Sequence, residues 1–410
     1  MSTLITNIKF LYQVYDEPPK RLAGTSMSEL PYLQDAFLFM KDGLIADFGL
    51  MSDLNKFDAD HIINAQGKSV LPAWCDSHTH LVFAQSRVQE FVDRINGLSY
   101  QDIAAKGGGI LNSAQALRTM PEDLLFESAK NRVKKLIEIG TSAIEIKTGY
   151  GLDLDSEMKM LRVIKRLKDY FSIAIKATFL AAHAVPKEFL TTESYVSHII
   201  DDMIPVVGSS GLADFIDVFC EKGYFNVNQM ERILIAAACH GLQPKVHVNQ
   251  FNSFGGVATA IKHNALSIDH LEIITEDDIT AMKNSESMPV ALPGCSFFLG
   301  IPYTSGRKLI DEGLPLALAS DFNPGSSPSG NLNFVFSLAC IKMRLSPEEA
   351  LNALTINAAY AMGLEQSHGT ITIGKKAHVI ITQPIEQLSD LPYHFGQNMI
   401  SNVLINGNLI

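Results

Sequence analysis

The chain has 410 residues, of which 47% are hydrophobic and 19% charged, so it is long and apolar enough to bury a large core. Its 44 acidic side chains outnumber its 33 basic ones, and the net charge of −11 argues against a nucleic-acid-binding protein, which would carry a basic surface. No apolar run approaches the ~18 residues of a membrane-spanning helix, and the first residues, MSTLITNIKF, lack the pattern of a secretory signal. The five scattered cysteines form no CxxC pair, which is typical of reduced thiols. We therefore expect a cytoplasmic protein that binds neither nucleic acid nor a membrane.

Strands are predicted at the start of the chain, within residues 1–67. Apolar and polar residues alternate in Leu4–Tyr12 and Ala36–Gly49, as they do in half-buried strands. Asp42-Gly43 lies within the second segment, and an Asp-Gly pair is a strong signal for a two-residue hairpin turn. These residues alone supply too few strands for a stable sheet.

Residues 68–363 alternate short apolar runs with segments of helical periodicity, such as Glu122–Ile139, Ser156–Leu167, Gln229–His240 and Ile301–Glu312. The runs that predict strands are Val70–Phe83, Ser142–Lys147, Ile173–Ala182, Asp214–Cys220, Pro244–Asn249, Ala265–Leu271, Met288–Leu292 and Pro315–Ser320. Eight strand–helix units favour an α/β fold with a (β/α)8 barrel of the TIM type. A doubly wound open sheet is the alternative, but the triple glycine Gly107–Gly109 does not follow an early strand as a phosphate-binding loop would. We interpret it as a flexible loop over the strand ends.

The C-terminal residues 364–410 again show strand alternation, in Gly369–Thr382 and Asn398–Ile410, with Asn406-Gly407 as a second hairpin signal. Neither end of the chain can form a stable sheet by itself. We therefore expect residues 1–67 and 364–410 to combine into one small β-sandwich domain, with the barrel of residues 68–363 inserted between its two parts.

The most specific pattern is Asp76-Ser77-His78-Thr79-His80, at the end of the first barrel run. Residues i and i+2 of a strand point to the same face, so His78 and His80 are both expected to face the barrel interior. Two adjacent imidazoles are difficult to satisfy by hydrogen bonds in a core, but they suit a pair of metal ligands.

Further ionisable residues end later strands: His183, His247, His270 and Asp321. Taken singly, each is explained as a hydrogen-bonded core histidine or as an Asp that caps a turn. In a barrel, however, the strand ends converge on one rim, where catalytic residues gather. Together they favour a metal centre.

His78, His80, His247 and Asp321 supply three nitrogen ligands and one oxygen ligand, which suits one divalent ion, Zn²⁺ or Fe²⁺, with a position left for water. Such an ion lowers the pKa of bound water toward ~7. Asp321 is a candidate to take a proton from that water, and His270, just outside the ligand shell, is a candidate to orient it.

The sequence around these residues resembles the amidohydrolase superfamily, and within it the imidazolonepropionase family of histidine degradation. The matching blocks are HTHLVFAQSR (78–87), GGGIL (107–111), EIKTGYGLDL (145–154), FLAAHAVP (179–186), DVFCEKG (217–223), DHLE (269–272), LPGCSFFLG (292–300), ASDFNPGS (319–326) and LPYHFG (391–396). The resemblance implies a hydrolase of cyclic amides. It would cleave the ring amide C–N bond of 4-imidazolone-5-propanoate, with hydroxide held by the metal as nucleophile, to give N-formimidoyl-L-glutamate.

The resemblance also implies how the substrate is held. Arg87 suits the propanoate, because a guanidinium can bind a carboxylate through two hydrogen bonds. The other implied contacts with substrate or product are Tyr150, His183, Asn323, Gly325 and Ser326. The last three residues are also explained by an ordinary turn, since the sequence Asn-Pro-Gly-Ser consists of residues that favour turns.

Three positions depart from the family pattern. Gln85 stands where a glycine is common and His378 where an acidic residue is common, and we interpret both as local packing changes; the third affects the proton path. Relatives usually carry a Glu three residues after the histidine of the fifth barrel strand, whereas this chain has Gln250 after His247. A glutamine cannot take a proton, so the base would be Asp321 or His270, while Gln250 hydrogen-bonds the ring.

Two other functions remain open. A deaminase of a cyclic amidine, such as guanine or cytosine, would use the same ligand pattern but would not need Arg87. A metal-free scaffold protein would explain Gln250, although such proteins usually lose the metal ligands. The apolar segment Leu332–Lys342 fits a homodimer contact, as relatives tend to be dimers, and it fits an ordinary buried helix equally well.

Overall fold

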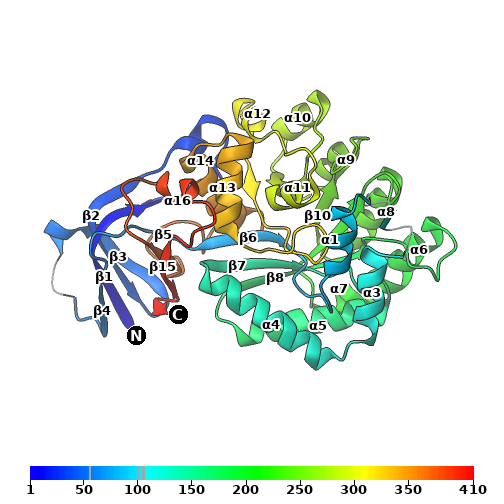
Figure 1. Ribbon diagram of the computed structural model, residues 1–410, viewed down its shortest axis with the longest axis horizontal. Helices are drawn as coiled ribbons and strands as arrows, with labels where there is room; N and C mark the ends of the chain where they lie inside the picture. The colour runs from blue at the N-terminus through cyan, green and yellow to red at the C-terminus, as the bar shows by residue number, and fades with distance from the viewer. Residues whose placement is uncertain (55–56, 99–101, 104–106) are drawn as a thin grey trace.

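The computed structural model describes residues 1–54, 57–98, 102–103 and 107–410, which form a barrel and a smaller β-sheet unit (Figure 1). The small unit contains both ends of the chain, and the residues between them build the barrel. None of the helices in the described part of the chain is both long and apolar enough to cross a membrane.

Eight strands form the barrel sheet, and each pairs in parallel with the next one in the chain. They are β6 (Trp74–Thr79), β7 (Thr141–Lys147), β8 (Ala174–Ala182), β9 (Phe215–Cys220), β10 (Gln243–Val248), β11 (Ser267–His270), β12 (Met288–Ala291) and β13 (Ala317–Leu318). Two backbone hydrogen bonds complete the ring beyond β13. The amide of Asp321 donates to the carbonyl of His78 at 3.0 Å, and the amide of His80 donates to the carbonyl of Phe322 at 2.9 Å. The predicted (β/α)8 barrel is confirmed, and the open sheet is not formed.

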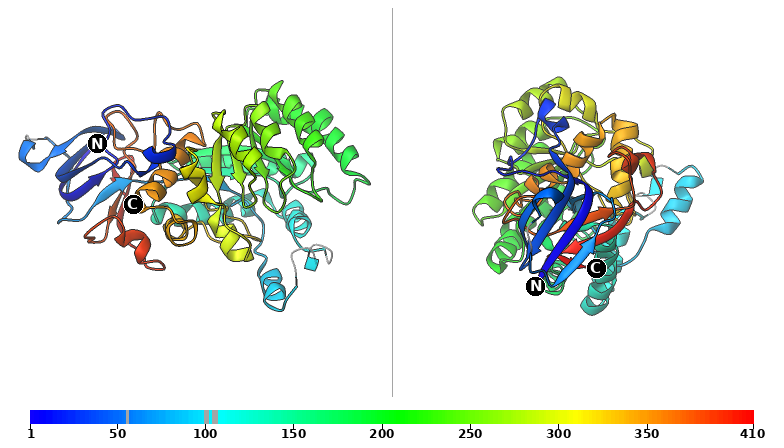
Figure 2. Two further views of the ribbon diagram at one scale, coloured as in Figure 1. Left: turned by 90° about the horizontal axis from the view of Figure 1, so that it is seen from above. Right: turned by 90° about the vertical axis from the view of Figure 1, so that its left-hand side faces the viewer.

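The helices of the outer layer bury apolar stripes. In α4 (Glu122–Glu138), the buried residues Leu125, Ala129, Val133 and Leu136 recur at helical spacing. The other helices are α1 (Val88–Ile95), α3 (Ile110–Thr119), α5 (Leu154–Tyr170), α6 (Thr192–His198), α7 (Ile204–Ser210), α8 (Val227–Ala238), α9 (Gly256–Lys262), α10 (Glu276–Lys283), α11 (Pro293–Leu299), α12 (Gly306–Asp311), α13 (Leu332–Met343), α14 (Pro347–Leu354), α15 (Ile356–Tyr360) and α16 (Asp390–Tyr393). Figure 2 shows α1 and α3 projecting from one side of the barrel. The helix predicted at Ile301–Glu312 is shorter, because Gly300 ends α11 in a left-handed conformation and a loop precedes α12.

The small unit is one connected sheet in the order β16-β15-β14-β5-β1-β2-β3, with β4 paired to β1. Its strands are β1 (Ser2–Tyr12), β2 (Tyr32–Lys41), β3 (Leu44–Leu50), β4 (His61–Asn64), β5 (Val70–Pro72), β14 (Val379–Thr382), β15 (Ile400–Ile405) and β16 (Asn408–Leu409). Both predicted hairpin turns form. Asp42 and Gly43 have φ of 53° and 80°, and Asn406 and Gly407 have φ of 50° and 75°.

Strand β5 joins the two ends of the chain, because it pairs in parallel with β1 and antiparallel with β14. The apolar run Val70–Phe83, which we assigned to the barrel, therefore divides between two sheets. Its first three residues belong to the small unit, and only β6 enters the barrel. Apolar periodicity cannot show this division, since both strands are fully buried and only their hydrogen-bond partners differ. The domain ranges 1–67, 68–363 and 364–410 remain predictions.

Candidate active site

The residues predicted at the strand ends come together at one rim of the barrel. His80, His183, His247, His270 and Asp321 line the same cavity, although up to 241 positions separate them in the chain. His270 and Asp321 both have a left-handed backbone, with φ of 87° and 53°. Non-glycine residues adopt this conformation only when the surrounding structure holds them in it, and such residues cluster at functional sites.

The four predicted metal ligands point at a common centre. The Nε2 atom of His80 lies 3.3 Å from that of His78 and 3.3 Å from that of His247. Asp321 places Oδ1 3.6 Å from Nε2 of His78 and 3.7 Å from Nε2 of His80. Burial is the main cause that lowers the pKa of His78 and of His80 well below the usual range, so both imidazoles are neutral near pH 7.

This arrangement fits a cation. The Nδ1 atoms of His78 and His247 each face a carboxylate, so these histidines present unprotonated Nε2 atoms to the centre. Nε2 of His80 lies 3.3 Å from Nε2 of His78 and from Nε2 of His247. A proton on Nε2 of His80 could form a hydrogen bond with only one of these two nitrogens. One cation shared by the nitrogens and Asp321 removes the conflict, and three nitrogens with one oxygen are a donor set that Zn²⁺ and Fe²⁺ both accept.

Two carboxylates behind the centre orient the imidazoles. Asp269 Oδ2 lies 2.6 Å from Nδ1 of His78, and Asp217 Oδ2 lies 2.8 Å from Nδ1 of His247. Lys147 places its ammonium between them, 2.8 Å from Asp217 and 3.6 Å from Asp269. Burial alone would raise the pKa of Asp217, but His247 and Lys147 hold it below the usual range. The sequence analysis missed these residues, and the signal that could have found them is a charged side chain inside an otherwise apolar strand run.

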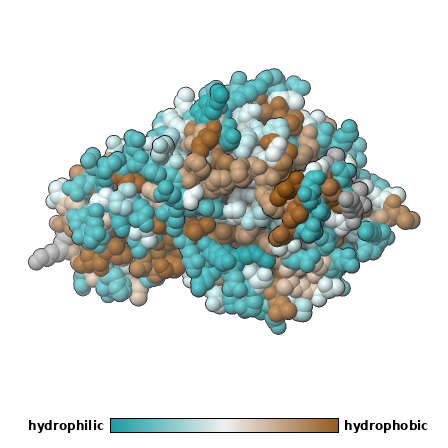
Figure 3. All heavy atoms as spheres, viewed as in Figure 1, coloured by the Kyte–Doolittle hydropathy of each residue, from teal (hydrophilic) through white to brown (hydrophobic). Residues whose placement is uncertain are grey.

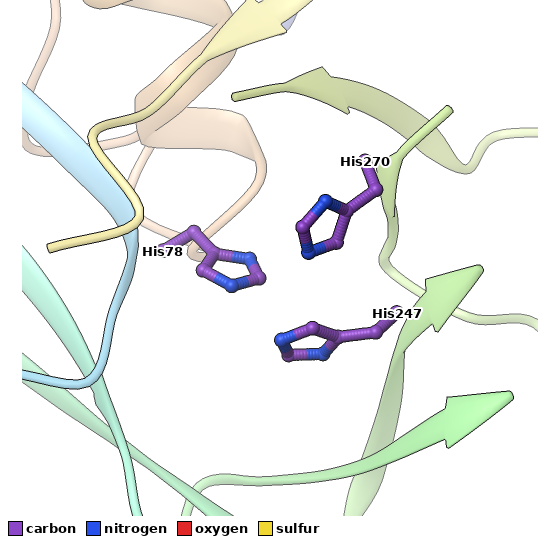
Figure 4. A group of neighbouring side chains, drawn as sticks. All are labelled: His78, His247 and His270. Atoms are coloured by element: carbon purple, nitrogen blue, oxygen red, sulfur yellow. The ribbon is translucent and has the colours of Figure 1, made fainter. Parts of the chain in front are cut away.

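His270 approaches the centre from β11. Figure 4 shows it pointing, with His78 and His247, toward one space from β6, β10 and β11, and nitrogens of these three imidazoles lie within 4.8 Å of one another. Its Nδ1 lies 3.2 Å from Oε1 of Glu272. Burial, the largest single cause, would lower the pKa of His270, but the carboxylates of Glu272, Asp321 and Asp269 together outweigh it and raise the pKa to about 9. Gln250 also lines the cavity, where its Nε2 atom donates to Sγ of Cys295 at 3.4 Å.

Arg87 lies at the N-terminus of α1 and lines the same cavity. Its guanidinium packs against Gly325, because a Cβ atom at that position would lie only 2.1 Å from Nη2 of Arg87. The Nε atom of Arg87 donates to Glu90 at 2.8 Å. The arginine is therefore buried and fixed, and it is not a solvated surface residue.

Tyr150 and His183 also line the cavity. The ring of His183 stacks on His80 at 5.2 Å and lies 5.5 Å from the ring of Tyr150. Nδ1 of His183 lies 2.9 Å from the carbonyl oxygen of Gly149, which is an acceptor, so the ring carries its proton on Nδ1. Burial, followed by the nearby His247, lowers the pKa of His183 to about 3, and the ring therefore stays neutral.

Asn323, Gly325 and Ser326 form a tight turn beside Asp321. The Oδ1 atom of Asn323 accepts from the amides of Gly325 at 2.8 Å and Ser326 at 2.7 Å. Its Nδ2 atom donates to the carbonyl of Asp321 at 2.7 Å. The turn therefore uses these backbone donors internally and ties itself to Asp321; their contact with substrate or product remains a prediction.

Comparison with known proteins agrees with this geometry. A model of the amidohydrolase family matches residues 149–404. The curated imidazolonepropionase of Flavobacterium johnsoniae is 56% identical over 411 aligned residues, which cover 100% of both chains. A curated imidazolonepropionase of Pseudomonas putida is 42% identical and covers 92% of this chain and 94% of its own.

Solved structures share the fold at low identity. A mutant atrazine chlorohydrolase of Arthrobacter aurescens, complexed with zinc and atraton, matches with a TM-score of 0.73 and 16% identity over 99% of this chain and 94% of its own. Guanine deaminase of E. coli matches with a TM-score of 0.74 and 14% identity over 100% and 99%. At such identity the likeness concerns the fold alone, whereas the curated relatives match the full length. The chain belongs to the imidazolonepropionase family of amidohydrolases.

Proposed function

We propose that this chain is an imidazolonepropionase, which hydrolyses the ring amide C–N bond of 4-imidazolone-5-propanoate to N-formimidoyl-L-glutamate. One observation carries the proposal. His80, His247 and Asp321 of the three-imidazole, one-carboxylate centre line the same cavity as a buried arginine, so the reacting amide and the acid group of one small molecule can be held together. The names of the curated relatives support the same reaction.

His78, His80, His247 and Asp321 would hold one divalent cation, zinc or iron. When bound, such a cation acts as a Lewis acid and lowers the pKa of coordinated water, which makes hydroxide available near neutral pH. Asp217 and Asp269 keep the Nε2 atoms of His247 and His78 unprotonated by accepting from their Nδ1 atoms.

The protein side chains position the substrate. Arg87 would bind the propanoate, and this cation is needed because the chain as a whole is acidic. Tyr150 and His183, which line the same cavity, would contact the imidazolone ring. Asn323, Gly325 and Ser326 would complete the pocket beside Asp321, with Asn323 holding the turn in shape.

Cleavage of the C–N bond requires one proton to leave the attacking water and one to reach the leaving nitrogen. Asp321 is the proposed acceptor, since its carboxylate lies at the centre. His270 is the proposed group that orients the water and holds a proton, because Glu272 faces its Nδ1 and leaves Nε2 on the opposite edge of the ring. Gln250 cannot take a proton, and it would hydrogen-bond the ring.

The deaminase alternative is weaker, since an uncharged base gives no role to Arg87 and two deaminases among the similar solved structures are only 14% and 15% identical. A metal-free scaffold is also weaker, because all four ligand candidates are present and converge. We also propose that the protein is cytoplasmic and forms a homodimer. It is proposed to bind neither nucleic acid nor a membrane.

A spectrophotometric assay tests the proposal. Imidazolone absorbance should fall as N-formimidoyl-L-glutamate appears, and guanine and cytosine should release no ammonia. His78→Ala should lose both bound metal and turnover, since one of four ligands is removed. Arg87→Ala should raise KM and keep the metal content. Unchanged kinetics in Arg87→Ala would contradict the substrate assignment and leave the metal centre intact.

A further inference from the structure

Helix α1 is polar toward the barrel and apolar toward solvent. Val88, Phe91, Val92 and Ile95 are all exposed, and Figure 3 shows hydrophobic side chains gathered over α1. Arg87, Glu90 and Arg94, spaced at i, i+3 and i+7, lie on the other face. Arg94 donates to the carbonyl of Gly325 at 3.2 Å. Polar contacts therefore hold this helix at the mouth of the cavity, where most helices would use an apolar stripe.

Glu90 is the centre of those contacts, and only 8% of it is exposed. Its Oε2 atom accepts from Nε of Arg87 at 2.8 Å. Its Oε1 atom accepts from the backbone amide of Gly109 at 2.9 Å and from Nδ2 of Asn112 at 3.4 Å. One carboxylate thus joins the arginine at the start of α1 to the start of α3.

Gly108 allows this close approach. A Cβ atom there would lie 2.7 Å from Cγ2 of Ile103 and 3.1 Å from Oε1 of Glu90. Gly109 caps the N-terminus of α3, where the partial positive charge of the helix end attracts the carboxylate of Glu90. The next residue, Ile110, lines the cavity. Glu90 is therefore fixed from two sides, by a guanidinium and by a helix N-terminus.

The position of the arginine follows from this bond. Because Glu90 engages Nε, the guanidinium keeps one orientation, in which Nη1 and Nη2 lie against Gly325 at the cavity wall. A carboxylate so close to an anion-binding arginine weakens the field that attracts the anion. The contribution of Glu90 to the site is therefore geometric. A guanidinium that is already fixed binds a carboxylate with less loss of side-chain entropy than a mobile one.

We propose that Glu90 is a positioning residue that sets the preference for a carboxylate-bearing substrate by fixing the guanidinium of Arg87. This inference rests on the proposed function of Arg87. Glu90 touches neither the proposed metal ligands nor the reacting atoms, so its replacement should act on substrate affinity and not on metal content.

Glu90→Gln is the sharpest variant. An amide has one oxygen and one NH2 group, so it cannot accept from both Arg87 and Gly109, and one of these donors must face a donor. Gln89→Ala is the matched control, since Gln89 is an exposed neighbour on the same helix that hydrogen-bonds Asp93. The test measures kcat and KM on 4-imidazolone-5-propanoate and on its uncharged propanamide for the wild type, Arg87→Ala, Glu90→Gln and the double variant.

Glu90→Gln should raise KM for the propanoate about tenfold, should change kcat about twofold or less, and should reduce the preference for propanoate over propanamide. In the Arg87→Ala background the same change should have almost no effect, because its target is absent. Glu90→Gln should keep the metal content and melting temperature of the wild type, which distinguishes positioning of Arg87 from a purely structural role. Gln89→Ala should keep the kinetics of the wild type. If Glu90→Gln folds poorly, Glu90→Asp replaces it in the test. Because it keeps the carboxylate, it should retain part of the preference for propanoate over propanamide.

Two results overturn the inference in distinguishable ways. If Arg87→Ala raises KM but Glu90→Gln does not, or if the effect of Glu90→Gln is as large without Arg87, Glu90 does not act through the arginine and only this inference fails. If Arg87→Ala leaves KM unchanged, the role of Arg87 in the proposed function fails as well.

Discussion

Asp217→Asn should weaken metal binding more than Asp269→Asn, although each carboxylate holds one histidine of the proposed centre. Asp217 accepts three hydrogen bonds: from the His247 amide at 3.0 Å, from Nδ1 of His247 at 2.8 Å and from Lys147 at 2.8 Å. An Asn at this position has an NH2 group that faces a donor in either orientation. Asp269 differs, because its Oδ2 faces His78 while its Oδ1 has no hydrogen-bond partner among the described residues. An Asn there can direct its NH2 group to the Oδ1 side and still accept from His78.

The magnitudes follow from these contacts. Loss of a carboxylate behind a metal-binding histidine typically costs about 10- to 100-fold in metal affinity, and we expect Asp217→Asn near the upper value and Asp269→Asn near the lower one. Asp217→Asn also leaves the buried Lys147 with Glu145 at 2.7 Å and Asp269 at 3.6 Å as its only remaining ion-pair partners in the described structure. Breaking a buried ion pair costs about 3–5 kcal/mol, so the free energy of unfolding should fall as well.

Competition with a chromophoric chelator measures the zinc affinity of each variant, and urea unfolding of the metal-free proteins measures stability. Asp214→Asn is the control, since Asp214 lies just before β9 and pairs with Lys168 and Lys176, away from the centre. It should keep the wild-type metal affinity. Equal losses in Asp217→Asn and Asp269→Asn, or a larger loss in Asp269→Asn, would refute the reasoning from hydrogen-bond geometry.

Three further outcomes are expected. Gly325→Ala should raise KM with unchanged metal content, because its Cβ would lie 2.1 Å from Nη2 of Arg87; an unchanged KM would contradict this packing. Gln250→Glu should raise kcat if the centre lacks a base, whereas a lower kcat would favour a substrate-binding amide. Burial lowers the pKa of His368 to about 4 and of His378 to about 3. Below about pH 6.5 the unfolded chain takes up protons that the folded chain resists, so the free energy of unfolding should fall as pH drops, by up to about 1.4 kcal/mol per pH unit for each histidine. In urea titrations between pH 6.5 and 4, His378→Gln should reduce that slope, and an unchanged slope would show that His378 takes up a proton in the folded protein.

Periodicity along the chain predicts most of the fold, because each barrel strand is a short apolar run and most outer helices, unlike α1, bury an apolar stripe. It predicts the ends of the chain for the same reason, since alternation and two turn dipeptides mark the hairpins. It does not predict that Val70–Pro72 leaves the barrel, because a strand buried on both faces looks the same in either sheet.

A residue that ends a barrel strand can be predicted to lie at the rim of the barrel. The side chains that it contacts there cannot be predicted from this position. His78, His80, His247 and Asp321 could be named because they end strands that must converge. Lys147 meets Asp269, 122 positions away, and no local pattern shows such a contact. Likewise the family resemblance implies Asn323 as a substrate ligand, which remains a prediction, but it does not predict that its Oδ1 atom accepts from the amides of Gly325 and Ser326.

The charges inside the barrel give an independent reason for a divalent cation. Lys147 and Lys245 lie among Glu145, Asp217 and Asp269, all five fully buried or nearly so, and Asp321 faces the centre from the rim. Two ammonium groups and four carboxylates leave two negative charges, since burial keeps His78 and His80 neutral and the charges of His270 and Glu272 offset each other. Asp76 stands apart from this cluster, where it accepts from Ser320 and burial raises its pKa to about 7.

Unbalanced buried charge is costly, and a protein can remove it only by taking up protons or by binding a counterion. Burial opposes protons on His78 and His80, but it raises the pKa of Asp321 and of Asp269, so in the absence of a cation the first route runs through these carboxylates. A dication at the shared centre balances both charges at once and lies where the three Nε2 atoms already point. The buried lysines therefore have a role that packing alone does not explain, since without them the same carboxylates would demand more positive charge than one divalent ion carries.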